Sequence, residues 1–196
     1  RDGINRFRHE FNLSGQYSTI CNTLPQAGWI AGVGSLSGPD PREVKYSKVI
    51  IMWGGNPAST QVNFMKHVQT ARKKNGAFLV VIDPYLTKTA KIADLHIKLK
   101  PGTDGALACG IMKLLIENKK IDKEYLKKYS TGFKELKGHL LNKDKLWATG
   151  ISGVEYKKIL SLSNLISNTK KVFFRLGYGF TRHRNGSFNM HAVICI

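Results

Sequence analysis

Glycines, hydroxyls and an amide follow one apolar run of this chain in a pattern that suits ligand binding. The run 48–53 leads into Trp53-Gly54-Gly55-Asn56-Pro57-Ala58-Ser59-Thr60. Glycine lets the backbone turn sharply and approach a ligand closely. The hydroxyls of Ser59 and Thr60 can cap a following helix, whose free N–H groups suit phosphate. An ordinary strand-to-helix turn explains this stretch equally well, so the other loops must decide.

Three further loops place chemically useful residues after apolar runs. They are Asp83 and Thr87 in the second loop, Gly102, Thr103 and Asp104 in the third, and Gly177, Tyr178, Gly179, Arg182 and His183 in the fourth. Carboxylates can accept hydrogen bonds from ribose hydroxyls or from a purine N–H edge, while hydroxyls and helix N-termini suit phosphate. Each loop alone is more simply a helix cap or a tight turn, but the set of four favours nucleotide binding.

The elements that must position these loops alternate between strand and helix. Apolar runs predict strands, the third with one exposed face, over 48–53, 77–82, 96–100 and 171–176. Helical spacing of apolar residues predicts helices over 62–75, 105–118 and 155–163. This order is typical of an α/β fold, a Rossmann-like parallel sheet with helices on both faces. Ligands bind such sheets beyond the carboxyl ends of the strands, so we expect all four loops along one crevice.

The first 45 residues differ in character from the rest. They are polar and turn-rich, with an irregular opening and a small-residue helix that starts near residue 20. We therefore predict a lead-in segment over 1–45 and one binding domain over 46–196, with a turn over 147–154. An opening without methionine and an apolar final run suggest a piece of a longer protein, truncated at both ends.

Composition argues against several classes of protein. At 196 residues the chain can bury one sizeable core, and no apolar run approaches the roughly 20 residues of a membrane helix. The net charge of +18 would suit a polyanion, but the lysines are dispersed and aromatic residues do not interleave with them. Nucleic acid is therefore not an expected partner. The three cysteines form no CxxC pair, which argues against a zinc site and a disulfide framework.

Two common nucleotide-binding fingerprints are absent. The chain contains neither GxGxxG nor GxxxxGK(S/T), which argues against an ordinary NAD enzyme and a P-loop ATPase. Three ordered motifs indicate a different family: the Trp53–Thr60 stretch, Val81-Ile82-Asp83-Pro84-Tyr85-Leu86-Thr87-Lys88-Thr89-Ala90 with Ala93-Asp94, and Leu99-Lys100-Pro101-Gly102-Thr103-Asp104-Gly105-Ala106-Leu107. With 175–183 they resemble the molybdopterin oxidoreductases of the dimethyl sulfoxide reductase and formate dehydrogenase type. The resemblance runs from about Tyr17 to the C-terminus.

The resemblance implies a cofactor in which two molybdopterin guanine dinucleotides hold one molybdenum or tungsten ion. Gly55 and Asn56 would contact the nucleotide arm. Asp83 and Thr87 would hold ribose, guanine or phosphate, and Asp104 would bind the guanine edge. The full set of implied cofactor contacts is Trp53, Gly54, Gly55, Asn56, Thr60, Asp83, Thr87, Gly102, Thr103, Asp104, Gly177, Tyr178 and Gly179.

Cys21 is the position that the resemblance links to the metal. It lies a few residues before Ala27-Gly28, where the family places a cysteine, serine or selenocysteine ligand. A thiolate is a soft ligand that suits a metal already held by sulfur, although an unaided cysteine is more simply a buried core residue. Arg182 and His183 would lie near the pterin or the metal. Cys21, Arg182 and His183 are therefore the expected catalytic residues.

The expected function is that of one slice of a larger enzyme. The parent would oxidise or reduce a small-molecule substrate by two electrons, with an iron–sulfur cluster in a preceding part and possible transfer to an electron-transfer subunit. The isolated piece is expected to be inactive. A cytoplasmic parent is favoured, and a periplasmic one would require an export signal upstream. The alternatives are a non-catalytic guanine-nucleotide-binding module and, less favoured, a basic nucleic-acid-binding domain.

Overall fold

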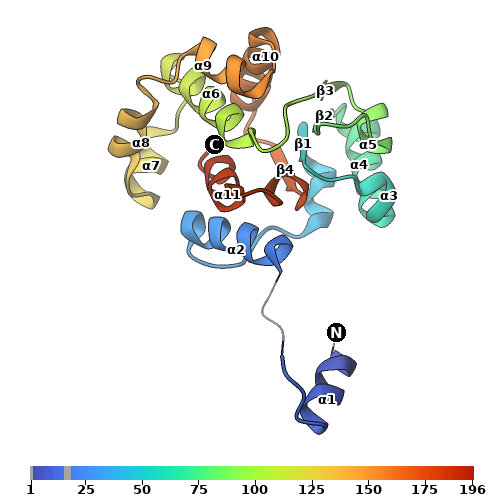
Figure 1. Cartoon of the computed structure of the whole chain (residues 1–196). Coiled ribbons are helices and arrows are strands. Elements are labelled where there is room, and N and C mark those ends of the chain that lie inside the picture. The colour runs from blue at the N-terminus through green and yellow to red at the C-terminus, as the bar shows by residue number, and fades with distance from the viewer. Residues whose placement is uncertain (1, 16–18) are drawn as a thin grey trace.

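The centre of the molecule is a sheet of four parallel strands (Figure 1). This computed structural model describes residues 2–15 and 19–196, apart from the side chains of Asp2 and Lys145. The strands are β1 Val49–Trp53, β2 Phe78–Ile82, β3 Leu95–Ile97 and β4 Val172–Leu176. Their β-branched and aromatic residues fit a buried pleated surface, and the four predicted strands are confirmed, the third in a shorter form.

The order of the strands reverses at one point of the sheet. The order is β3-β2-β1-β4, so β1 pairs with both β2 and β4. Val49 of β1 faces Phe78 on one side and Val172 on the other. The chain moves outward from β1 through β2 to β3 and then crosses to the opposite side for β4. The reversal between β1 and β4 is the place where open α/β sheets bind ligands.

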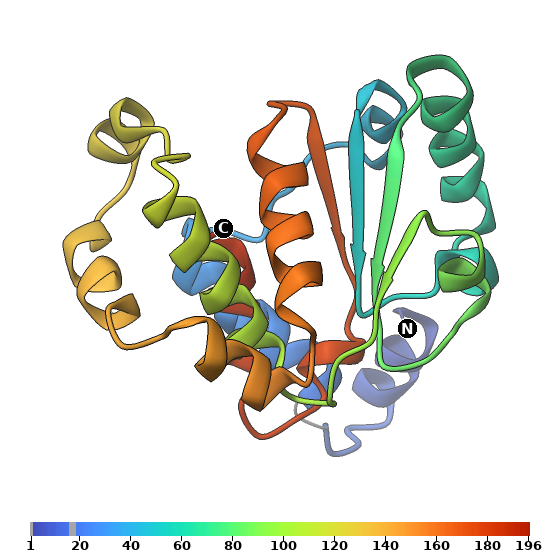
Figure 2. The ribbon, with the colours of Figure 1, turned by 90° about the horizontal axis from the view of Figure 1, so that it is seen from above.

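Helices cover both faces, because side chains along a strand alternate in direction. Ile50 and Met52 pack into one core cluster, while Ile51 and Trp53 pack into a second and larger one. Figure 2 shows α4 on one side of the strands and α6 with α10 on the other. The layer on one face contains η1 Pro41–Tyr46, α3 Pro57–Thr60, α4 Val62–Asn75 and α5 Lys88–Lys91. The layer on the other face contains α6 Asp104–Glu117, α9 Lys145–Ser152, α10 Tyr156–Ser167 and α11 Gly186–Ile194. The predicted α/β sheet with helices on both faces is confirmed.

The lysine-rich stretch forms helices beside α6. These are α7 Lys123–Tyr129 and α8 Phe133–Leu140, and Leu140 anchors α8 against Met112 of α6. The turn predicted over 147–154 is wrong, because α9 occupies most of that stretch. The Asp144 carboxylate starts α9 by accepting the Trp147 backbone N–H at 2.8 Å. A capping carboxylate of this kind stabilises a helix that apolar periodicity alone does not reveal.

The lead-in segment is more regular than predicted. It contains α1 Asp2–Glu10, where Phe7 and Phe11 have ring centroids 4.7 Å apart, and α2 Ile20–Val33. Residues 1 and 16–18 of the predicted irregular opening lie outside the described residues. Helix α2 packs on α11, with Gly28 against the Ser187 carbonyl. The boundary at residue 45 stays a prediction, but α2 is part of the packed body.

The helices of residues 2–15 and 19–196 can be compared with a membrane span in length and apolar character. None of them is both long enough and apolar enough to cross a bilayer.

Candidate functional site

The first and fourth strand-end loops touch at the reversal point of the sheet. The Gly177 N–H donates to Trp53 O at 2.8 Å, and the Gly179 N–H donates to Gly54 O at 3.0 Å. A Cβ atom at residue 177 would lie 2.3 Å from Gly54 O. Glycine at this position is therefore required for the two loops to approach each other, and their contact is made of backbone.

A buried threonine joins the second loop to the first. The Asn56 Oδ1 atom accepts hydrogen bonds from the Thr89 N–H at 3.2 Å and from the Thr89 hydroxyl at 2.7 Å. The same hydroxyl accepts the Ala58 N–H at 3.1 Å, and Thr89 is fully buried. Thr89 was not predicted as a site residue, because the sequence does not show that a threonine in a polar loop is buried in the folded structure. Asn56 was predicted to contact nucleotide, and in the structure its amide oxygen holds Thr89.

Helix α11 joins the third loop to the fourth. Asn185 and Asn189 both donate to Gly102 O, at 3.0 and 3.4 Å. Gly102 has a φ of +81°, and a Cβ atom there would lie 3.3 Å from Cγ of His183. All four loops thus lie along one edge, as predicted. The two asparagines were missed, since nothing in the spacing of 185–189 marks them.

Thr103 is the N-cap residue of α6, but the hydroxyls of Thr60 and Thr103 make no capping hydrogen bond. The Thr60 hydroxyl donates to Asn56 O at 3.0 Å, and the Thr103 hydroxyl donates to Lys100 O at 2.6 Å. Neither hydroxyl accepts an N–H group of the following helix. The N–H of Gly105, in the first turn of α6, is instead bound by Asn189 Oδ1 at 3.1 Å. This N–H group is therefore already occupied by the protein.

The two carboxylates of the edge are buried to different degrees. Asp83 is 8% exposed, and its carboxylate accepts the Tyr85 N–H at 2.9 Å. Burial raises the pKa of this carboxyl, against the lowering effects of the Tyr85 N–H and of nearby His96. Asp104 is 2% exposed and accepts the indole N–H of Trp53 at 2.7 Å. The side chains of Trp53 and Asp104, both predicted to contact cofactor, therefore bind each other beneath the edge.

Stability should depend on pH through Asp104. Burial raises the pKa of this carboxyl to about 6, despite the Trp53 hydrogen bond, while 3.8 is its ordinary value. The folded chain then binds the proton more tightly than the unfolded chain, so Asp104 stabilises most below pH 3.8 and this contribution is lost as pH rises through about 6. Relative to Asp104→Asn, wild type should lose about 2–3 kcal/mol of unfolding free energy between pH 4 and pH 7.5.

Urea unfolding at several pH values checks this dependence, with the exposed Glu135→Gln variant as control. The control should follow wild type throughout, because Glu135 lies on the surface of α8. A constant difference between wild type and Asp104→Asn across this range would contradict the raised pKa of Asp104.

Several polar side chains remain accessible on the edge. Tyr178 is 49% exposed, Arg182 and Thr60 are exposed, and Thr87 and His183 are half-buried. The Thr87 hydroxyl also accepts the Ala90 N–H at 3.1 Å. These groups offer hydroxyls and positive charge around a glycine backbone, which suits an anionic ligand with hydrogen-bonding groups.

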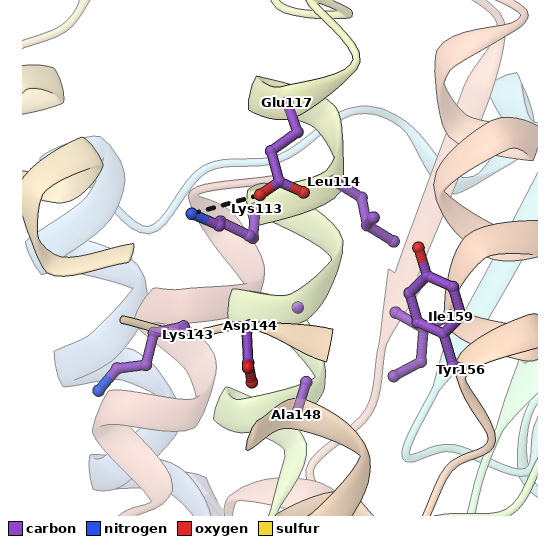
Figure 3. A pocket seen from close by; sticks show the side chains of 9 residues that line it. Lys113, Leu114, Glu117, Lys143, Asp144, Ala148, Tyr156 and Ile159 are labelled. Carbon is purple, nitrogen blue, oxygen red and sulfur yellow. Dashed lines mark ion pairs between the residues drawn. The ribbon is translucent and has the colours of Figure 1, made fainter. Parts of the chain in front are cut away.

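Two cavities lie beside the sheet. One, of about 370 Å³, adjoins the first loop and is lined by Pro41, Thr60, Gln61, Val62, Asn63, Phe64 and Arg175. The other, of about 230 Å³, lies between α6, α9 and α10 (Figure 3). Lys113 and Glu117 form an ion pair of 3.4 Å on its wall. None of its lining residues belongs to the four loops, whereas Thr60 of the first loop lines the larger of these two cavities.

Cys21 lies at the beginning of α2 and is half-buried. Gly28 of α2 faces Ser187 of α11, and Gly32 faces Ile194, so the two helices run in the same direction. This packing directs the Cys21 end of α2 toward the start of α11 and the fourth loop, and α2 contacts η2 Gly179–Thr181. Within the described part of the chain, no three His, Cys, Asp or Glu residues gather into a metal site.

The family follows from a comparison with protein-family models. The molybdopterin oxidoreductase model matches residues 5–196. The chain belongs to the molybdopterin oxidoreductase family. The family that the sequence motifs resemble is therefore confirmed.

Relatives of this molybdopterin oxidoreductase chain are much longer than it is. It is 36% identical over 191 residues to the probable oxidoreductase YoaE of Bacillus subtilis, covering 97% of this chain and 28% of the relative. It is 31% identical over 183 residues to the dimethyl sulfoxide reductase DmsA of Escherichia coli, covering 82% and 22%. It is 44% identical over 97 residues to the assimilatory nitrate reductase catalytic subunit of Bacillus subtilis, covering 50% and 14%. The chain thus spans about a quarter or less of these relatives.

A solved structure confirms the fold. Acetylene hydratase from Pelobacter acetylenicus superimposes with a TM-score of 0.76 at 22% identity, covering 90% of this chain and 24% of that structure. At this identity the likeness concerns the fold alone.

Proposed function

We propose that this chain is the part of a molybdenum or tungsten oxidoreductase that binds one arm of a bis-(molybdopterin guanine dinucleotide) cofactor. The observation that carries the proposal is the meeting of four strand-end loops at the β1–β4 reversal, with the helix of Cys21 packed beside them. Nucleotides bind α/β sheets at such reversals. Membership of the molybdopterin oxidoreductase family supports the choice of this nucleotide over others.

Accessible side chains of the edge, together with the largely buried Asp83, would fit a guanine dinucleotide. The glycine backbone of loops one and four allows close approach of the flat pterin and its pyrophosphate. Asp83 would accept ribose hydroxyls, and Thr87 with Tyr178 would donate to phosphate oxygens. Exposed Arg182 supplies a positive charge for the pyrophosphate. The side chain of His183 would lie beside the pterin, where it can donate to an electronegative ring atom.

The Cys21 thiolate would bind the metal. A bound molybdopterin supplies sulfur ligands to molybdenum or tungsten and makes the metal a site of two-electron transfer. A soft thiolate from the protein adds to that sulfur set and tunes the potential of the metal.

The parent enzyme would act on a small molecule. Relatives carry the names of dimethyl sulfoxide reductase and nitrate reductase, which are names of small-substrate reductases. Further domains of the parent would complete the substrate pocket and carry electrons through an iron–sulfur cluster, with an electron-transfer subunit as the next partner. The 196-residue chain alone would be inactive, because it contributes only one wall of the cofactor site.

Replacing Asp83 should lower the cofactor content of the parent enzyme. Asp83→Asn keeps the shape and the bond from the Tyr85 N–H but removes the charge that favours ribose hydroxyls. Since a lost hydrogen bond weakens binding by about 1 kcal/mol, cofactor content should fall several-fold. The measurement is guanosine monophosphate released by acid hydrolysis, together with metal content, and wild type should yield two nucleotides per metal ion.

The matched control is Asp122→Asn, an isosteric change at the beginning of α7, where asparagine caps as well as aspartate. It should retain the full cofactor. Wild-type enzyme that releases guanine nucleotide but contains no metal would favour a non-catalytic nucleotide-binding module. Equal cofactor content in Asp83→Asn and wild type would remove Asp83 from the site.

A further inference from the structure

Asn189 is a buried polar side chain that contacts three parts of the candidate site. It is 1% exposed and lies in the first turn of α11. Its Nδ2 group donates to Gly102 O at 3.4 Å and to Phe180 O at 3.3 Å, while its Oδ1 atom accepts the Gly105 N–H at 3.1 Å. One amide thus binds the third loop, the fourth loop and the N-terminus of α6.

Asn185 strengthens the same connection. Its Nδ2 group donates to Gly102 O at 3.0 Å and to Asn189 Oδ1 at 3.1 Å. Gly102 is held from α11 by two amides, and the ring of His183 lies directly against Gly102. We call Asn185 and Asn189 the amide clamp.

The clamp also reaches the helix that carries Cys21. The residue after Asn189, Met190, lies against Gly28 of α2, where a Cβ atom would come within 2.8 Å of the Met190 Cβ. Helices that pack as closely as α2 and α11 have little freedom to slide along each other. Any movement of the loops relative to α11 would therefore change their position relative to Cys21 as well.

We propose that Asn189 is a positioning residue that sets the third and fourth loops, and with them His183, relative to the Cys21 helix. An amide is suited to this task because it donates and accepts at once: carbonyls of the loops need a donor, and the α6 N-terminus needs an acceptor. This inference rests on the proposed function for its meaning, but the arrangement that it predicts can be measured without any cofactor chemistry.

Asn189→Asp separates the two halves of this task. The carboxylate retains an acceptor for the Gly105 N–H, and the N-terminus of a helix favours its charge. It removes the donor to Phe180 O and one of the two donors to Gly102 O, and it places negative charge against both carbonyls. The α6 end should stay in place while both loops are loosened, the third loop less than the fourth because Asn185 still donates to Gly102 O.

Hydrogen exchange in the parent enzyme, followed by mass spectrometry, tests this split. In Asn189→Asp, peptides covering 178–184 should exchange about tenfold faster, the factor expected when the buried Phe180 carbonyl loses its donor, and peptides covering 100–103 should exchange faster by a smaller factor. Exchange at 105–108 should stay as in wild type. Guanosine monophosphate released per chain should fall several-fold. Asn142→Asp, an exposed change between α8 and α9, should alter none of these quantities.

Two outcomes would overturn the proposal. One is wild-type exchange in both loops of Asn189→Asp. The other is faster exchange spread evenly over α6, α11 and the sheet, which would mean that Asn189 stabilises the whole fold and not the two loops in particular. If Asn189→Asp fails to fold, Asn185→Ala removes one exposed donor to Gly102 O and should speed exchange at 100–103 alone; no change there would also overturn the proposal. Absence of guanine nucleotide from the wild-type enzyme would refute the proposed function. The hydrogen-exchange result would still test the positioning role of Asn189 independently.

Discussion

Cys21→Ala in the full-length parent enzyme is expected to abolish turnover while leaving most of the pterin bound. The cofactor would be held by the strand-end loops, which this change does not touch, whereas the metal would lose its protein ligand. Loss of residues that only orient metal ligands already costs about 10- to 100-fold, so loss of the ligand itself should cost more than about 100-fold. Steady-state turnover and pterin fluorescence after oxidative release measure the two quantities separately.

Two further variants make this test specific. Cys21→Ser offers a harder oxygen ligand in the same place and should retain part of the activity with a changed metal spectrum. Cys195→Ala removes an exposed cysteine near the chain end and should behave as wild type. Wild-type turnover in Cys21→Ala would refute the assignment of Cys21 to the metal, and parallel loss of pterin and turnover would make Cys21 a residue of cofactor binding instead.

Gly177→Ala is expected to destabilise the fold by about 2–3 kcal/mol, the upper range for overpacking. The added Cβ would lie 2.3 Å from Gly54 O and 2.7 Å from the Gly55 Cα, and both contacts are to backbone. Backbone of paired strands cannot rotate away as a side chain can. The Gly177 N–H bond to Trp53 O, now 2.8 Å, should lengthen, and the two loops at the reversal of the sheet should separate.

Urea unfolding of the chain measures this effect, and Gly138→Ala is the matched control. Gly138 lies inside α8 with no atom within 4 Å of an added Cβ, so alanine there should stabilise by about 0.5–1 kcal/mol through helix propensity. A lower unfolding free energy in Gly177→Ala and a higher one in Gly138→Ala would show that the space around each glycine decides the effect of the added methyl group. A Gly177→Ala variant as stable as wild type would contradict the close approach of the two loops.

Periodicity in the sequence was sufficient to predict the layered α/β core. The runs at 49–53 and 78–82 are apolar over their whole length, because strands buried on both faces need no polar side, and 172–176 has a single charged residue, Arg175. The helix 62–75 was also predicted with its end, since Gly76 takes the left-handed conformation, with a φ of +62°, that terminates helices. Parallel strands place their ends on one edge, so the common edge of the four loops was predictable as well.

The sequence did not reveal which side chains of the loops face a ligand and which hold the loops together. Asp104, Asn56 and Trp53 have residue types that suit ligand binding, but Asp104 and Trp53 bind each other beneath the edge and Asn56 binds Thr89. Such choices depend on distances between segments far apart in the chain, and spacing along the chain contains no record of them.

Some features of this protein are determined by its local sequence and others by its tertiary packing. Local order of residues determined the strands, the strand-end loops and the motifs that place the chain among molybdopterin oxidoreductases. Only the tertiary structure assigned Thr89 and Asn189 their central place, because a buried polar group takes its partners from whichever segments pack around it. Packing of α2 on α11 likewise decided that the Cys21 end of its helix points toward the fourth loop, since that contact joins residues more than 150 positions apart.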